Sequence, residues 1–328
     1  MSKKRILTGD RPTGPLHIGH FVGSLISRVE LQNEYEMFIL VADLHTLTTK
    51  SNPVSMRENI INVVADNIAA GVDPKKATFF IQSEIPEIAE LSVILGMYTT
   101  VNRLQRVPTL KEIMSDLHIN QPSFGLLGYP VLQAADILSF QANLVPVGED
   151  QLSHIEVTRE LAKKINTLAG KSILTLPKPH LQKVARLLGT DGQAKMSKSI
   201  GNTIALGDTK ETVKKKVMSM YTDPNRLKAT DKGRVEGNPV FQYHDAFNHN
   251  LAEVEDLKQR YTKGKVGDVE VKEKLVVALE KLLAPIRELR AGLTNTQIEN
   301  ILKEGTAKAR VEVQKTLDQV KKGIGLGL

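Results

Sequence analysis

The chain has 328 residues, of which 41% are hydrophobic and 25% charged, so it can bury a large core and has room for more than one domain. It has no cysteine, which excludes disulfides and thiolate zinc sites, and its net charge of +7 suits a polyanionic partner without identifying one. No apolar run is long enough to span a bilayer, and Thr8-Gly9-Asp10 interrupts the apolar stretch that a signal peptide would need. We therefore expect a cytoplasmic protein without zinc or a membrane span.

The first half of the chain alternates strand-like and helix-like segments. Strands are predicted over residues 5–8, 37–42 and 78–81. Apolar residues recur at helical spacing over 18–29, and a second helix is predicted over 53–70 with Asn52 as its cap. This alternation is typical of an α/β fold, namely a Rossmann-like doubly wound parallel sheet covered by helices.

The character of the chain changes after residues 177–179, Pro-Lys-Pro, where strand-like runs become scarce and the sequence turns helical and lysine-rich. We predict a Rossmann-like catalytic domain over 1–188 and a smaller all-helical domain over 189–287. A last amphipathic helix is expected over 297–320. The pattern leaves open whether the segment 288–328 belongs to the small domain or packs back on the first one.

A strand-to-helix turn is predicted at residues 12–20, which read Pro-Thr-Gly-Pro-Leu-His-Ile-Gly-His. The unpaired N–H groups at a helix start and the helix dipole favour an anion there. His17 and His20 lie one helical turn apart, and both can donate hydrogen bonds to phosphate oxygens. A simple capping turn with two surface histidines is the alternative. No metal site is predicted, because the two histidines have no acidic or cysteine partner nearby.

A second phosphate site is indicated by Lys195-Met196-Ser197-Lys198-Ser199, a segment flanked by glycines at 189, 192 and 201. Two ammonium groups on a glycine-flanked loop suit a reaction in which negative charge builds up on a departing pyrophosphate. A solvated lysine-serine loop is the alternative.

Together these two segments resemble the two ATP-binding signatures of the class I aminoacyl-tRNA synthetases. The resemblance implies that His17, His20, Lys195 and Lys198 act in catalysis, and that Lys111 adds a further cation for the phosphates. For Lys111, a surface lysine paired with a nearby acid is the alternative. The ATP contacts that the resemblance implies are Arg11, Pro12, Thr13, Gly19, His20, Gly148, Glu149, Asp150, Leu187, Lys195, Met196, Ser197, Lys198 and Ser199.

An amino-acid pocket is suggested by Tyr129, Gln133 and Asp136, whose spacing of four and three places them on one face of a helix predicted after Pro130. From the residues alone, this polar face either looks inward at a ligand or is exposed to solvent. Downstream, residues 145–151 end a predicted strand and open a helix, and such junctions are where open α/β sheets bind ligands.

The letters Tyr-Pro-Val-Leu-Gln-Ala-Ala-Asp-Ile-Leu at 129–138 and Pro-Val-Gly-Glu-Asp-Gln at 146–151 resemble tryptophanyl-tRNA synthetases in particular. By this resemblance Asp136 accepts the indole N–H, Tyr129 and Gln151 hold the α-amino group, and His45 reaches the carboxylate. Gln133 and Leu7 would line the indole slot, where a methionine and an aromatic residue are common in the family.

The resemblance implies that the chain joins tryptophan to tRNA(Trp) through tryptophanyl-adenylate, with Mg²⁺ carried on the ATP. The helical, lysine-rich half would contact the tRNA, and a homodimer is expected. Three alternatives stay open: a tyrosyl-tRNA synthetase, a small adenylyltransferase, and a non-enzymatic RNA-binding protein built like a synthetase.

Overall fold

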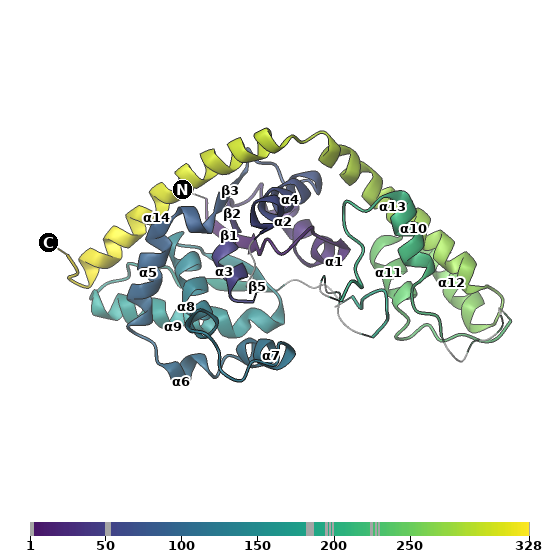
Figure 1. The fold of residues 1–328 in the computed structure, drawn as a ribbon, viewed down its shortest axis with the longest axis horizontal. Coiled ribbons are helices and arrows are strands. Elements are labelled where there is room, and N and C mark those ends of the chain that lie inside the picture. Colours follow the sequence, from purple (N-terminus) through teal and green to yellow (C-terminus); the bar gives the residue numbers. More distant parts are fainter. Residues whose placement is uncertain are drawn as a thin grey trace. The chain divides into compact units, whose positions relative to one another are not determined.

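The computed structural model describes residues 3–49, 54–181, 187–193, 196, 198, 200–223, 226, 228 and 230–327. The chain divides into two compact units, drawn in Figure 1. The sheet unit comprises Met1–Thr13, Ile26–Lys183 and Thr294–Leu328, and the helical unit comprises Gly14–Leu25 and Val184–Leu293. Each unit therefore collects segments that are far apart in the sequence.

The sheet unit is built on five parallel strands in the order β3-β2-β1-β4-β5. The strands are β1 (Arg5–Asp10), β2 (Glu36–Val41), β3 (Ala77–Ile81), β4 (Leu144–Val147) and β5 (Lys178–Leu181). β2 is buried from Met37 to Val41, as expected of a strand with layers packed on both faces. This arrangement confirms the predicted Rossmann-like α/β fold.

One strand was not predicted. β5 reads Lys-Pro-His-Leu, which has no apolar run, and it pairs only with β4 at the edge of the sheet. An edge strand tolerates the missing N–H of Pro179, because one side of it needs no ladder partner.

Helices surround the sheet in this unit (Figure 1). They are α2 (Ile26–Leu31), α3 (Asp43–Leu47), α4 (Met56–Ala69), η2 (Gln82–Glu84), α5 (Pro86–Gly96), α6 (Val101–Leu104), α7 (Pro108–Asp116), α8 (Phe124–Ser139), η3 (Glu149–Gln151), α9 (Leu152–Leu168) and α14 (Asn295–Gly323). The prediction that α8 starts after Pro130 is wrong. The Ser123 side chain caps the helix by accepting from Leu126 N at 3.1 Å, and Pro130 lies inside it at the loss of one backbone bond. The predicted cap of α4, Asn52, lies outside the described residues.

The last helix, α14, packs on β3 in the sheet unit. A Cβ on Gly305 would lie 1.9 Å from the carbonyl oxygen of Phe79, so the helix backbone sits directly on the strand. At β1, Arg5 bonds both Glu36 at 2.9 Å and Glu312 at 2.6 Å. Neither α14 nor any other helix of the described chain is long and apolar enough to cross a membrane.

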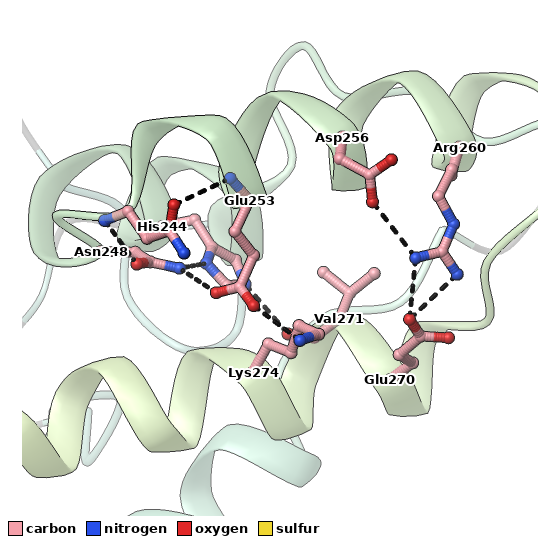
Figure 2. Close-up of polar contacts among 9 residues, drawn as sticks. His244, Asn248, Glu253, Asp256, Arg260, Glu270, Val271 and Lys274 are labelled. Carbon is pink, nitrogen blue, oxygen red and sulfur yellow. Dashed lines mark hydrogen bonds and ion pairs between the residues drawn. The ribbon is translucent and has the colours of Figure 1, made fainter.

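The helical unit contains α1 (Ile18–His20), η1 (Phe21–Leu25), α10 (Lys210–Met218), α11 (Pro239–Phe247), α12 (Leu251–Thr262) and α13 (Asp268–Ala291). Figure 2 shows the polar network that joins α11, α12 and α13. His244 Nε2 donates to the Val271 carbonyl at 2.9 Å, and the Asn248 amide donates to both His244 Nδ1 and Glu253. Lys274 completes the network with an ion pair to Glu253 at 2.6 Å. Burial lowers the pKa of His244, which keeps the ring neutral and its Nδ1 an acceptor.

The boundary between the units after Lys183 lies close to the predicted division after residue 188. The segment from Thr294 onward lies in the sheet unit, which is one of the two placements that the sequence pattern left open, whereas residues 14–25, which fall within the predicted first domain, lie in the helical unit. The reason is hydrogen bonding between distant segments, which leaves no mark on local composition.

Gly305→Ala should lower the free energy of unfolding by about 1–3 kcal/mol, because the added methyl group collides with the β3 backbone. Gly128→Ala is the matched control, since Gly128 is also helical but has no heavy atom within 4 Å of the position that an added Cβ would take. It should be neutral or stabilise by up to about 1 kcal/mol. Urea unfolding followed by circular dichroism measures both, and equal shifts would contradict the close packing.

Candidate active site

The turn at residues 14–20 is organised by its two histidines. His17 caps α1 by accepting from Gly19 N at its Nδ1 (3.1 Å), and His20 Nδ1 accepts in return from His17 N (3.2 Å). The two ring centroids are 3.9 Å apart. A neutral imidazole whose Nδ1 accepts carries its proton on Nε2. Both rings are thus prepared to act as Nε2–H donors.

A short backbone pairing fixes this turn to the segment that follows Lys195–Ser199. Ile18 N donates to Ile204 O at 3.0 Å, and Leu206 N donates to Leu16 O at 2.9 Å, so that His17 and Ala205 form an antiparallel bridge. Residues 14–20 of the first signature therefore belong to the same compact unit as the second signature, although the two are far apart in the sequence, whereas Pro12 and Thr13 lie in the sheet unit.

Side chains of the second signature touch the first. Lys198 Nζ donates to the Gly14 carbonyl at 2.7 Å, and Gly14 itself has a φ of 132°, which favours glycine. A Cβ on Gly19 would lie 2.9 Å from the His17 ring and 3.0 Å from the sulfur of buried Met196. Gly19 is thus required by packing. Lys195, Ser197 and Ser199 lie outside the described residues.

The base of this loop is closed by Asn202. Its backbone carbonyl accepts from Thr190 N at 3.0 Å, and its side-chain amide donates to Asp191 at 3.0 Å. A Cβ on Gly189 would lie 2.1 Å from that amide, so the glycine permits the closure. Leu187, another predicted ATP contact, is buried in the helical unit.

In the sheet unit, Asp136 is the centre of a buried polar group. Its side chain on α8 is 1% exposed, and it accepts from His45 Nε2 at 2.8 Å and from Gln82 Nε2 at 2.8 and 3.0 Å. His45 lies on α3 just after β2, and Gln82 comes directly after β3. Of the three polar residues on α8, Asp136 is thus buried, whereas Tyr129 and Gln133 are half-buried.

Burial raises the pKa of the Asp136 carboxyl, and the hydrogen bonds from His45 and Gln82 act in the opposite direction by stabilising its ionised form. Gln82 was missed by the sequence analysis, although a polar residue directly after a buried apolar strand is a usable signal. Its Oε1 has no hydrogen-bond partner among the described residues. His45 contacts Asp136 here, which differs from the carboxylate contact that the family resemblance implies.

A second polar cluster of the sheet unit surrounds Tyr129. The phenol oxygen lies 2.8 Å from His154 Nε2. Nearby, Gln133 Nε2 lies 3.5 Å from Gln151 Oε1, and Gln151 Nε2 donates to Asp150 at 3.0 Å. Burial raises the pKa of Tyr129, which keeps the phenol protonated, and burial lowers the pKa of His154 to about 4, which keeps its ring neutral.

The remaining predicted residues of the sheet unit differ in how far they are buried. Leu7 is part of the hydrophobic core and Pro12 is buried. Arg11 is exposed, and its guanidinium lies 3.3 Å from the Thr49 hydroxyl. Lys111 is exposed on α7, and half-buried Thr13 donates its backbone N–H to the Arg11 carbonyl. Gly148, Glu149 and Asp150 follow β4, and a Cβ on Gly148 would lie 2.6 Å from Asp150 Oδ1. In the described ranges, no group of three His, Cys, Asp or Glu residues could hold a metal ion.

Known proteins resemble this chain over nearly its whole length. The family model for tRNA synthetases class I (W and Y) matches residues 2–284. Tryptophan–tRNA ligase of Treponema pallidum (strain Nichols) is 52% identical over 327 residues, covering 98% of this chain and 97% of that protein. The chain belongs to the class I tryptophanyl-tRNA synthetases. The ligase of Borreliella burgdorferi is 49% identical and covers 99% of the chain and 95% of the relative.

Solved structures agree with this family. Tryptophanyl-tRNA synthetase from Campylobacter jejuni, complexed with ADP and tryptophan, matches with a TM-score of 0.87 and 34% identity, covering 98% of this chain and all of that one. Tyrosyl-tRNA synthetase from Archaeoglobus fulgidus matches with a TM-score of 0.62 and 25% identity over 88% of this chain and 90% of that one. The predicted family is confirmed, and the tryptophan prediction holds over the tyrosine alternative.

The buried His154 gives the protein a pH-dependent stability. Its pKa is about 4 in the folded chain against 6.5 for an ordinary histidine, so between these values the unfolded chain binds more protons and stability falls as pH falls. The loss attributable to His154 should be about 2 kcal/mol between pH 7 and pH 5. His154→Phe removes this titration. Urea unfolding at the two pH values should therefore show a smaller loss for the variant, and equal losses would contradict the burial of a neutral ring.

Proposed function

We propose that the chain is a tryptophan–tRNA ligase, which forms tryptophanyl-adenylate and pyrophosphate from L-tryptophan and ATP and then transfers tryptophan to the 3′ end of tRNA(Trp). The observation that carries the proposal is the buried carboxyl group of Asp136, an acceptor held in place by two N–H donors. Its sequence neighbours on α8, Ala134, Ala135 and Ile137, belong to the hydrophobic core, so the carboxyl group lies at the border of that core. A planar apolar ring with one N–H matches such an environment.

We assign the recognition of tryptophan to side chains of the sheet unit. Asp136 accepts the indole N–H, and we assign Gln82 the role of holding the carboxylate in a fixed orientation. Tyr129 and Gln151 offer oxygens to the α-ammonium group, while Gln133 and Leu7 bound the ring. For His45 we keep the contact with the substrate carboxylate that the family resemblance implies, beside its hydrogen bond to Asp136.

ATP recognition is assigned to the two signature segments and their neighbours. The Nε2–H groups of His17 and His20 donate to phosphate oxygens. Lys195 and Lys198 neutralise the pyrophosphate as it leaves, with Lys111 as a third cation. Mg²⁺ arrives bound to the ATP phosphates. We also propose contacts with the nucleotide for Arg11, Pro12, Thr13, Gly19, Gly148, Glu149, Asp150, Leu187, Met196, Ser197 and Ser199.

The chemistry needs no protein nucleophile. The tryptophan carboxylate, ionised at pH 7, attacks the α-phosphorus of ATP and displaces pyrophosphate, so the protein contributes positioning and charge stabilisation. In the second step a ribose hydroxyl of the terminal adenosine attacks the carbonyl carbon of the adenylate and releases AMP. A proofreading site is unnecessary, since a buried acceptor rejects analogues that lack the matching donor by about 10⁴–10⁵-fold.

The partners follow from the surfaces. Exposed lysines of α10 support contact of the helical unit with the tRNA backbone; they are Lys210, Lys214 and Lys215.

The sheet unit exposes large apolar side chains over α5, α6 and the start of α8, including Met97 at 74% and Phe124 at 91% exposure. Such side chains support a homodimer through this face. A cytoplasmic location, where aminoacylated tRNA is used, stays a prediction.

Exchange of labelled pyrophosphate into ATP, run with each of the twenty amino acids, tests this function directly. We expect exchange with tryptophan alone, and Asp136→Ala should raise KM for tryptophan far more than KM for ATP. Exchange with tyrosine only would contradict the specificity. No exchange with any amino acid would favour the non-enzymatic RNA-binding alternative.

Gly19→Ala should reduce kcat/KM for ATP by about 10²-fold, because the methyl group displaces the His17 ring and the Met196 sulfur from the turn. Gly23→Ala lies in the same segment with no heavy atom within 4 Å of the added position, so it should leave this constant nearly unchanged. The same exchange assay at varied ATP concentration compares the two. Similar losses in both variants would show that Gly19 serves helix geometry and not the packing of the ATP site.

A further inference from the structure

His154 is a fully buried imidazole that the proposed reaction does not use. It lies on α9 with no exposed surface, and its Nδ1 has no hydrogen-bond partner among the described residues. Its Nε2 lies 2.8 Å from the Tyr129 hydroxyl and 3.3 Å from the Thr109 hydroxyl. Three helices, α7, α8 and α9, thus contribute one side chain each to a buried cluster.

Packing alone does not account for a histidine in this place. A buried polar atom without a partner costs about 1–3 kcal/mol, and a leucine or phenylalanine would fill similar space without that cost. The ring keeps its Nε2 within hydrogen-bond distance of the phenol, which is the polar end of Tyr129. This contact and the one with the Thr109 hydroxyl are benefits that an apolar residue could not supply.

The contact restricts the Tyr129 hydroxyl to two orientations, one for each tautomer of the His154 ring. If Nε2 is unprotonated, it accepts the phenol proton; if it is protonated, it donates to the phenol oxygen, and Thr109 is positioned to take the phenol proton. In both tautomers a lone pair of the phenol oxygen stays available for another donor. Tyr129 also lies edge-on to the His45 ring, at 6.5 Å between centroids, and His45 binds Asp136. The Tyr129 ring is therefore a neighbour of the histidine that binds the proposed indole acceptor.

We propose that His154 is a positioning residue for the α-ammonium subsite: it holds the Tyr129 hydroxyl so that the phenol oxygen accepts a hydrogen bond from the substrate ammonium. The inference rests on the proposed function and adds to it a residue that does not touch the substrate. A cationic donor suits this oxygen, because the neutral His154 ring leaves no competing positive charge beside it.

The test separates the ammonium from the rest of the ligand. L-Tryptophan and indole-3-propionate share the indole and the carboxylate, and only tryptophan carries the α-ammonium group. The chain contains no tryptophan, so the indole fluorescence of the protein–ligand complex, separated from free ligand, comes only from the bound ligand. His154→Asn removes the Nε2 contact and keeps an amide near the Nδ1 position, whereas His154→Gln keeps an amide near Nε2 and is the matched control.

We expect His154→Asn to weaken tryptophan binding by about 10- to 100-fold and to leave indole-3-propionate binding unchanged, whereas His154→Gln retains most of the tryptophan affinity. Tyr129→Phe should give the same selective loss. The double variant His154→Asn/Tyr129→Phe should bind tryptophan no more weakly than Tyr129→Phe alone, because His154 acts only through the hydroxyl.

Equal weakening of both ligands by His154→Asn, or additive losses in the double variant, would overturn the positioning role and leave the proposed function intact. Failure of the wild-type protein to bind tryptophan would overturn the proposed function and this inference with it. Circular dichroism establishes that each variant folds, and His154→Phe replaces His154→Asn if the latter does not.

Discussion

The buried Asp136 carboxyl group is the constraint on which the sheet unit depends. A carboxylate is costly to bury unless N–H donors meet it, and here they come from His45 after β2 and Gln82 after β3. The two strands are neighbours in the sheet order, so their carboxyl ends deliver both donors to the same point below α8. The fold thus creates one fixed, buried acceptor at the border of the hydrophobic core, which suits the proposed recognition of a large ring with a single N–H.

A second constraint governs the phosphate chemistry. Backbone bonds between Leu16–Ile18 and Ile204–Leu206 place residues 14–20 of the first signature in the same compact unit as the second, and the Lys198 ammonium and the Met196 side chain add contacts to the turn. Lys198, which we propose for the charge of the leaving pyrophosphate, belongs to the helical unit, whereas Lys111 lies on α7 of the sheet unit. The side chains that we propose for tryptophan belong to the sheet unit, which also holds Asp136 and the Tyr129–His154 pair.

The sequence predicts the fold class well where local physics dominates. The apolar runs of β1, β2 and β3 identify three of the five strands, and the motif letters identify the family. The polar edge strand β5 has no such run, so the sequence does not predict it. The Ser123 cap starts α8 before Pro130, although a proline inside a helix removes a backbone hydrogen bond. Membership of residues 14–25 in the helical unit depends on hydrogen bonds across the sequence, as do the partners of Gln82 and His154, so no local pattern predicts them. The family resemblance names residues that touch ligands, whereas the supporting ones emerge only from the structure.

Replacing the indole N–H by sulfur tests the role of Asp136 most directly. β-(1-Benzothiophen-3-yl)alanine has the shape of tryptophan without the donor, so it offers no N–H to the buried carboxyl group. We expect kcat/KM for pyrophosphate exchange to fall by about 10⁴-fold with this analogue in the wild-type protein, and the preference for tryptophan to vanish in Asp136→Ala. Equal use of the two amino acids by the wild-type protein would contradict the assignment of Asp136 as the indole acceptor.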